Sequence, residues 1–179
     1  MLAVAGGTGV TFALPIALAA MNQQVAPKYV LDLVWVVRTA QDLLWLRTEL
    51  MMLRSAAKDR AGLRVKIFIT RESKAHQSPL TEYGMEKGEA SRSTTFVTSS
   101  EALGNLLEQT SVSFSISFLD GQHPSMAEIV NDFLDRSGAM GGVVEIVGSG
   151  PEGMGSDLRC AIADVRSMES LRFHWDARE

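Results

Sequence analysis

The sequence predicts an α/β fold: a mainly parallel sheet of five to six strands with helices on both faces. Two observations predict it. Short, largely apolar segments alternate with segments of helical period along most of the chain. This order of strand, helix and strand favours parallel pairing, because parallel strands need crossover connections. With 179 residues and no visible repeat or second core, the chain is interpreted as one domain, 1–179.

The first half of the chain supplies three strands and two helices. Residues 2–5 are a short apolar strand ended by glycines, and residues 10–24 follow as a helix. Residues 29–37 are β-branched and nearly all apolar, as expected of a strand covered on both faces. Residues 40–58 change to helical period with a broad apolar stripe. Residues 63–70 alternate and form the third strand.

The second half begins with a polar segment, 72–98, which has no period and is expected to be a flexible insertion. Residues 112–119 alternate strictly between apolar and polar, so one face of this strand is less apolar than the other. A helix at 125–136 has Ser125 as N-cap and Glu128 at the capping-box position. The remaining expected elements are a short helix at 99–108, strands at 142–147 and 171–175, and a helix at 156–165.

Composition excludes several classes of function. The net charge of −4 argues against a nucleic-acid-binding surface. The single cysteine, Cys160, excludes a multi-cysteine metal site, and the three histidines lack ligand spacing, so no metal is assigned. Residues 2–20 are uncharged and long enough to cross a bilayer, but glycines and Pro15 interrupt them and no basic residue precedes them. We therefore expect a soluble chain without a membrane span.

The residues that follow each strand define a candidate ligand site, because ligands of open α/β sheets bind outside the carboxyl ends of the strands. Two glycine-rich loops, 6–11 and 148–154, should share this rim with Arg38 and Arg71. Glycines let the backbone approach a ligand, and the helix starting near residue 10 directs unpaired N–H groups at a diphosphate. Each arginine can hold a further phosphate with two hydrogen bonds. Together they predict a dinucleotide with an extra phosphate, and so NADPH rather than NADH.

Each of these signals is weak by itself. The first loop is not the usual G-x-G-x-x-G. The second strand is followed by Arg38, where an acidic residue would hold a ribose hydroxyl, and this favours a 2′-phosphate. The plainer interpretation is that the arginines are ordinary surface residues and the glycines form only tight turns. The convergence of all these residues on one rim favours the nucleotide site.

Six motifs carry a resemblance to a known family. In chain order they are residues 4–11 (VAGGTGVT), 33–38 (LVWVVR) with Trp45 downstream, 65–71 (VKIFITR), 121–124 (GQHP), 147–154 (VGSGPEGM) and 157–162 (DLRCAI). With these motifs the chain resembles the NAD(P)H-binding lobe of the ferric reductase and NADPH oxidase family. That lobe is related to the ferredoxin–NADP reductases and has a Rossmann-like fold. The similarity is greatest to fungal metalloreductases, through Trp-Val-Val-Arg and the long insertion after the third strand.

The resemblance implies an NADPH-dependent oxidoreductase in which cytosolic NADPH gives a hydride to FAD. Electrons then pass singly through membrane haems to ferric or cupric ion, or to oxygen in a superoxide-producing NADPH oxidase. The implied partners are the FAD-binding domain and the haem transmembrane domain of the same parent protein, expected upstream of residue 1. The lobe would lie at the cytosolic side of a plasma or internal membrane, and this chain alone would be an inactive fragment that binds neither FAD nor haem. The alternative is a non-catalytic module that binds a nucleotide or a partner through the same rim.

The resemblance also implies the site residues. The candidate catalytic residue is Ser149, where the family usually has cysteine. His123 stands where the family often has arginine, and no residue near residue 179 is assigned to cover the flavin. The candidate cofactor-binding residues are Gly6, Gly7, Thr8, Gly9, Thr11, Arg38, Thr70, Arg71, Gly148, Gly150, Pro151 and Met154.

Four other residues are interpreted as structural. Cys160 is expected to be a buried thiol, since no basic partner that would lower its pKa is evident. Trp45, Met51 and Met52 fall on the apolar stripe of the expected helix at 40–58. We therefore expect them in the core rather than at the cofactor.

Overall fold

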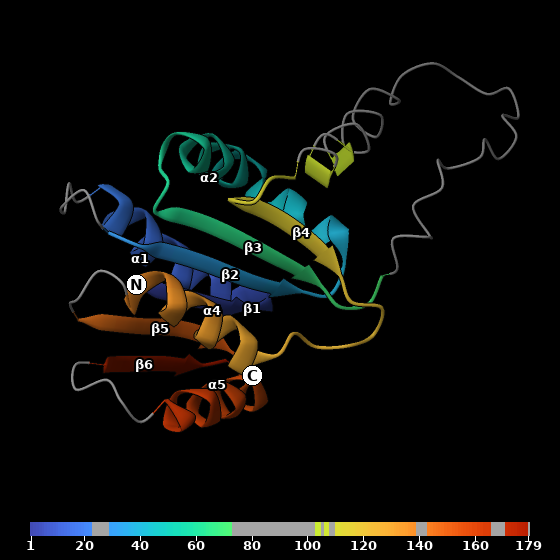
Figure 1. Cartoon of the computed structure of the whole chain (residues 1–179). Helices are drawn as coiled ribbons and strands as arrows, with labels where there is room; N and C mark the ends of the chain where they lie inside the picture. The colour runs from blue at the N-terminus through green and yellow to red at the C-terminus, as the bar shows by residue number, and fades with distance from the viewer. Residues whose placement is uncertain are drawn as a thin grey trace, which may run out of the picture.

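The protein is built on a six-stranded sheet in the order β4-β3-β2-β1-β5-β6, in which every neighbouring pair is parallel (Figure 1). The computed structural model describes residues 1–22, 29–72, 103–104, 106–107, 110–138, 143–165 and 171–178. The strands are β1 (Leu2–Gly6), β2 (Leu31–Val37), β3 (Leu63–Ile69), β4 (Phe114–Phe118), β5 (Val144–Gly150) and β6 (Leu171–Ala177). The helices are η1 (Gly7–Gly9), α1 (Val10–Asn22), η2 (Ala40–Leu46), α2 (Arg47–Asp59), α4 (Met126–Gly138) and α5 (Glu152–Asp164), where η marks a 3₁₀ helix. The predicted Rossmann-like α/β fold is confirmed.

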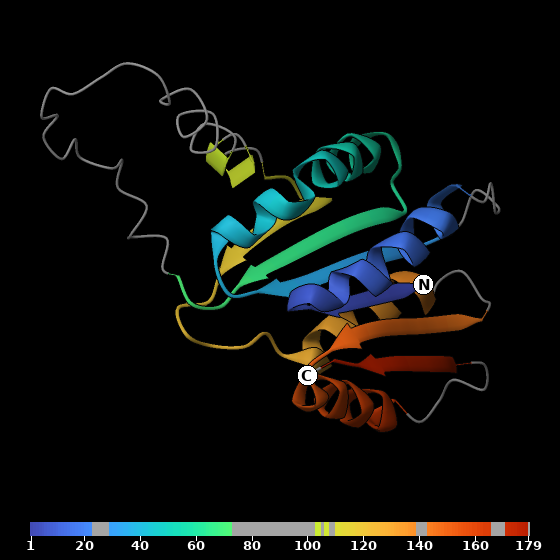
Figure 2. The same cartoon turned by 180° about the vertical axis from the view of Figure 1, so that it is seen from behind.

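Helices cover both faces of the sheet, and each face has its own apolar core. α1 and α2 lie on one face, seen in front of the sheet in Figure 2, while α4 and α5 pack against the other. β2 contributes to both cores: Leu33, Trp35 and Val37 belong to the first, and Val34 and Val36 to the second. Side chains alternate between the two faces along a strand, so a strand covered twice is apolar at nearly every position. β1 and β2 are accordingly buried along their whole length.

The strand order places a crevice near the middle of the sheet. From β1 the chain moves outward through β2 and β3 to β4, and then returns to the other side of β1 with β5. Such a reversal leaves a crevice at the carboxyl ends of the two strands that flank it. Those strands are β1, which ends at Gly6, and β5, which ends at Gly150. The ends of β2 and β3 lie on the same edge of the sheet (Figure 1).

Two regions differ most from the sequence-based expectation. The prediction of a loop at 148–154 is wrong. β5 continues to Gly150 and α5 begins at Glu152, so only Pro151 connects them. The strand continues because β5 lies between two neighbours, and the pairing still holds at Ser149. The expected single helix at 40–58 is also divided, since η2 is a 3₁₀ helix and only α2 is an α-helix.

Single residues of the helices give one confirmation and one correction. Ser125 Oγ accepts the N–H of Glu128 at 3.2 Å, which confirms the predicted N-cap. Cys160 is exposed, so the prediction of a buried thiol is wrong. α5 buries Leu158 and Ala161, and Cys160 is turned by about 200° around the helix from Leu158.

Two expected segments fall partly or almost wholly outside the described residues. Of the insertion expected at 72–98, only Glu72 is described, and its Oε1 accepts the N–H of Ala40 at 3.2 Å. Within the helix expected at 99–108, residues 103–104 and 106–107 are described and are helical. Among the helices that the structure describes, none is long and apolar enough to cross a membrane.

Five charged side chains join α4 to the amino ends of β2 and β3. Asp32, which is buried, accepts hydrogen bonds from Arg64 at 2.6 and 3.1 Å and one from Arg136. Asp132 accepts a hydrogen bond from Arg64 at 2.6 Å and one from Lys66. Partial burial raises the pKa of Asp132, but the hydrogen bonds and charges of Lys66 and Arg64 outweigh it and hold that pKa below its usual value. These residues, called the amino-end cluster below, fasten α4 at the edge opposite the crevice.

Candidate functional site

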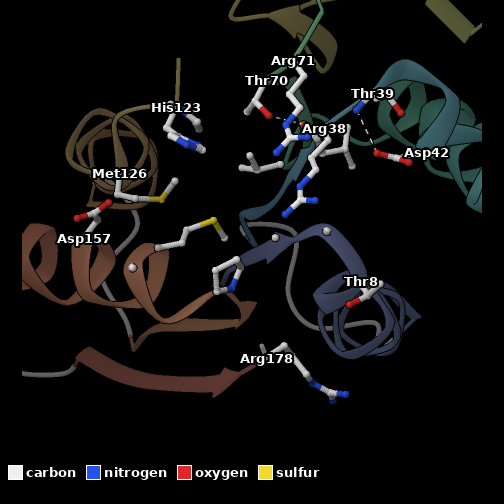
Figure 3. A pocket seen from close by; sticks show the side chains of 18 of the residues that line it. Thr8, Arg38, Thr39, Asp42, Thr70, Arg71, His123, Met126, Asp157 and Arg178 are labelled. Carbon is white, nitrogen blue, oxygen red and sulfur yellow. Dashed lines mark hydrogen bonds between the residues drawn. The ribbon is translucent and has the colours of Figure 1, made fainter. Parts of the chain in front are cut away.

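A pocket of about 740 Å³ lies at the edge of the sheet where β1, β2, β3 and β5 end (Figure 3). Its volume is within the range of about 300–1,000 Å³ that is usual for small-molecule sites. Most of the predicted cofactor-binding residues line it, namely Gly6, Gly7, Thr8, Arg38, Thr70, Arg71, Pro151 and Met154. Gly9, Thr11, Gly148, Ser149 and Gly150 do not line it. The structure therefore brings together the two strand-end arginines and parts of both glycine-rich segments.

The turn between β1 and α1 forms the floor of the pocket. Gly7 has a φ of +53°, which L side chains rarely adopt, and a Cβ at this position would meet nothing within 4 Å. The indole of Trp35 supports the turn from the first core, because its Nε1 donates to the Gly7 carbonyl at 3.0 Å. Thr11 does not line the pocket, and its hydroxyl donates to the Thr8 carbonyl at 2.9 Å. Gly7 and Thr8 are thus the residues of this turn that a ligand would meet.

The other glycines allow neighbouring backbones to pack closely. A Cβ at Gly9 would collide with the carbonyl oxygen of Ser149, and one at Gly150 would lie 3.0 Å from the backbone of Gly6. A Cβ at Gly148 would lie 2.5 Å from the carbonyl oxygen of Val4. These glycines are needed where η1 and β1 meet β5. Their small size serves the packing of the crevice rather than direct contact with the pocket.

Arg38 and Arg71 lie side by side at one end of the pocket. The N–H of Arg71 donates to the carbonyl of Arg38 at 2.9 Å, because β2 and β3 are paired up to their last residues. Both side chains are exposed, and neither guanidinium makes a hydrogen bond or ion pair with any described residue. Thr70, the residue before Arg71, donates its hydroxyl hydrogen to the Val37 carbonyl at 3.1 Å (Figure 3). Two positive charges are thereby left available to an anion.

The opposite wall comes from the β4–α4 connection and from α5. Figure 3 shows His123, Met126 and Asp157 across the pocket from Arg38 and Arg71. Met154 lines the pocket from the first turn of α5. His123, which the resemblance singled out, therefore lines the pocket.

Ser149 is held inside the protein. Its side chain is fully buried, and its hydroxyl donates to Asp176 Oδ2 at 3.2 Å. Asp176 also accepts from Arg178 Nε at 2.6 Å, and the Arg178 N–H donates to the Gly150 carbonyl at 2.9 Å. Arg178 lines the pocket, although the sequence analysis did not single it out. The signal that could have identified it is its position directly after the last strand. The sequence analysis ended that strand at residue 175, whereas β6 continues to Ala177.

Thr39 and the 3₁₀ helix η2 that follows it add pocket residues that the sequence analysis did not assign to the site. Thr39, Asp42 and Trp45 all line the pocket. The N–H of Thr39 donates to Asp42 Oδ2 at 3.0 Å. Trp45 is 65% exposed, and Met51 and Met52 are 41% and 59% exposed, so the prediction that these three lie in the core is wrong. The core side of this region is formed instead by Ala40, Leu43, Leu50, Leu53 and Ala57.

Metal chemistry finds no support in the described part of the chain. No group of three or more histidine, cysteine, aspartate or glutamate side chains there is arranged to hold a metal ion. The pocket offers instead glycine backbone, guanidinium groups and apolar side chains, which suit an organic anion.

The topology and the crevice define this protein as a Rossmann-like α/β domain with a pocket at its switch point. Residues 1–163 match the family model of the ferric reductase NAD binding domain, and the chain belongs to that family. The resemblance inferred from the six motifs is therefore confirmed. The family points to binding of a nicotinamide dinucleotide within an oxidoreductase. A search among curated proteins found no match.

Proposed function

We propose that this chain binds NADPH in the pocket and positions it for hydride transfer to FAD in a membrane flavin–haem reductase of ferric or cupric ion. The observation that carries the choice of NADPH is the pair Arg38 and Arg71, whose guanidinium groups have no partner among the described residues. A 2′-phosphate supplies the charge that such a pair binds. A hydrogen bond to a charged group contributes about 1.5–3 kcal/mol.

The rest of the pocket fits the remainder of the dinucleotide. The helix formed by η1 and α1 begins at Gly7, and the first N–H groups of a helix have no partner within it, which suits a pyrophosphate. Pro151 and Met154, at the junction of β5 and α5, would cover the nicotinamide. When bound, NADPH supplies the hydride, and the chain's own part is to orient the ring and exclude water.

Titration of the chain with NADPH and with NADH, followed by calorimetry, tests this proposal. We expect NADPH to bind at least about tenfold more tightly, because only NADPH engages the arginine pair. Equal affinity for the two would contradict the 2′-phosphate site. Absence of binding by either at millimolar concentration would contradict nucleotide binding altogether.

One residue favours NADH as a second candidate cofactor. Asp42 lines the pocket from η2, and a carboxylate beside an adenosine ribose binds its hydroxyls and repels a phosphate. One of its oxygens already accepts the Thr39 N–H. If the arginine pair sets the preference, Asp42→Asn should tighten NADPH and leave NADH unchanged. A variant that loses NADH affinity without gaining NADPH affinity would instead identify NADH as the cofactor.

The remaining parts of the proposal concern the parent protein. Its FAD-binding and haem transmembrane domains would receive the electrons, at the cytosolic side of a plasma or internal membrane. This chain with NADPH should then reduce neither ferric nor cupric chelates above the rate of NADPH in buffer. Reduction by the purified chain would contradict this division of labour. A superoxide-producing NADPH oxidase is the alternative parent, and its product, superoxide rather than reduced metal, distinguishes the two.

A further inference from the structure

The 3₁₀ helix η2 presents a row of residues to the pocket. A 3₁₀ helix has about three residues per turn, so side chains three positions apart lie in line. Trp45 and Asp42, one turn apart, both line the pocket, and so does Thr39, which precedes the helix. Ala40 and Leu43 form the neighbouring row and are buried in the core. The local 3₁₀ geometry thus turns Trp45 out of the core and toward the pocket.

Trp45 is exposed to a degree that the other two tryptophans are not. Its exposed fraction is 65%, whereas that of Trp35 is 1%. Trp35 has a structural task, since its Nε1 binds the Gly7 carbonyl, and Trp175 packs against the second core. An indole left in water forgoes the burial of a large apolar surface. An exposed indole on the wall of a pocket therefore indicates a ligand with a flat apolar face.

We propose that Trp45 is the stacking platform for the adenine base of the dinucleotide, and so a specificity-determining residue of the site. This inference rests on the proposed function, in which Arg38 and Arg71 bind the 2′-phosphate. The base and that phosphate are attached to the same ribose, so the base must lie near the two guanidinium groups. Trp45 is on the helix that directly follows Arg38 and Thr39, and it lines the same pocket.

The nicotinamide end is the less favourable partner for this indole. In the proposed function that ring lies against Pro151 and Met154, at the junction of β5 and α5. Trp45 follows β2, which is separated from β5 by β1 in the sheet. Stacking of a base on an aromatic ring contributes about 1–3 kcal/mol and requires no further hydrogen bond. The adenine base has a larger flat face than the nicotinamide ring, so it gains more from contact with this indole.

The test compares ligands that contain the adenosine end with one that lacks it. The chain is titrated by calorimetry with NADPH, with adenosine 2′,5′-bisphosphate and with reduced nicotinamide mononucleotide. Trp45→Ala should weaken the first two by about tenfold or more and leave the third unchanged. Trp45→Phe, which keeps an aromatic face, should remain within about threefold of wild type. Met52→Ala removes another exposed apolar side chain, outside the pocket, and should change none of the affinities.

Two further readouts separate stacking from a merely structural effect. Wild type should prefer adenosine 2′-monophosphate to uridine 2′-monophosphate, and Trp45→Ala should lose that preference. Tryptophan emission should change when adenosine 2′,5′-bisphosphate binds wild type, and this change should disappear in Trp45→Phe. Thermal unfolding should confirm that each variant is folded.

The possible failures are distinguishable. If wild type binds the bisphosphate but Trp45→Ala binds it equally well, stacking is refuted and the proposed function stands. If wild type binds neither NADPH nor the bisphosphate, both the stacking inference and the proposed function are refuted. If Trp45→Ala weakens the uridine and adenosine nucleotides equally, Trp45 shapes the pocket without stacking on the base, and this inference is overturned.

Discussion

Two groups of arginines lie at opposite ends of the same two strands, and their surroundings are opposite as well. At the amino end, Arg64 and Arg136 lie among the carboxylates of Asp32 and Asp132. At the carboxyl end, Arg38 and Arg71 have exposed guanidinium groups that pair with no described residue. The residue type is the same in the two groups, so burial and counter-charge make the difference.

The difference shows which arginines stabilise the fold and which are left available for a ligand. A partly buried guanidinium needs a counter-charge, because nothing else offsets the free energy lost on its desolvation. An exposed one is hydrated and keeps its capacity to bind a phosphate. α4 connects the two ends, since its last turns carry Asp132 and Arg136 while its first residue, Met126, lines the pocket. The amino-end cluster therefore also sets the position of one wall of the site.

The largest expected effect comes from breaking the amino-end cluster. Asp32→Asn removes the buried carboxylate that pairs with Arg64 and Arg136. It should lower the free energy of unfolding by about 3–5 kcal/mol, because Arg136 loses its carboxylate partner and Arg64 keeps only Asp132. Urea denaturation measures this loss. Arg159→Ala, which breaks an exposed pair with Glu152, is the control and should cost at most about 1 kcal/mol. An Asp32→Asn protein as stable as wild type would show that the cluster does not fasten α4.

The carboxyl-end arginines should give the reverse pattern. Arg38→Ala and Arg71→Ala should each weaken NADPH by about 1.5–3 kcal/mol, since each removes a charge-assisted hydrogen bond to the 2′-phosphate. The free energy of unfolding should change by no more than about 0.5 kcal/mol, because neither guanidinium has a partner in the described structure. Calorimetry and urea denaturation on the same variants give both quantities. An equal loss of NADH affinity would mean that these arginines do not act on the 2′-phosphate.

Trp35 links stability to the pocket, and its replacement should have an intermediate effect. Trp35→Phe keeps a ring in the core but removes the Nε1 donor to the Gly7 carbonyl. We expect a loss of about 1–2 kcal/mol in the free energy of unfolding, together with weaker binding of NADPH, because the turn that carries Gly7 is less firmly held. A variant that loses stability but binds NADPH unchanged would show that the turn does not depend on this bond.

The smallest expected effect is a dependence of stability on pH at the amino-end cluster. Lys66 and Arg64 hold the folded-state pKa of Asp132 below its ordinary value in the unfolded chain. The resulting stability is present above that unfolded value and is lost as the pH falls through the folded pKa. It should amount to less than about 1 kcal/mol, because the Asp132 side chain is 42% exposed. Urea denaturation between pH 3 and pH 6 of wild type and Asp132→Asn isolates it. Identical pH profiles of the two proteins would contradict it.

Much of the fold and part of the site could be predicted because the signals are local. β2 is apolar at nearly every position, which indicates a strand buried on both faces wherever its neighbours lie. Arg38 and Arg71 directly follow two predicted strands, and parallel pairing necessarily brings such ends together. Ligands of parallel α/β sheets bind at the carboxyl ends of the strands, so the edge that carries the site follows from the parallel pairing.

η2 could not be predicted in the same way. Its core residues, Ala40 and Leu43, are three positions apart, and this spacing suits a 3₁₀ helix as well as an α-helix. An α-helix and a 3₁₀ helix place the other residues differently. The α-helical period predicts Trp45 in the core, whereas the structure places it on the pocket wall. The type of helix here depends on how the chain leaves β2 and enters α2. The spacing of the apolar residues does not reveal that geometry.

The sequence by itself determined the α/β fold, the family and the rim where glycines and arginines gather, because each depends on periodicity or on residues adjacent to strand ends. Only the tertiary structure decided which of these residues face the pocket. Gly7 and Gly9 are two positions apart, yet one lines the pocket and the other packs against Ser149. Ser149 itself is buried against Asp176, and Arg178 enters the site in its vicinity. These outcomes depend on the register of β1, β5 and β6, in which residues distant in sequence meet within a few ångströms, and no local pattern encodes that register.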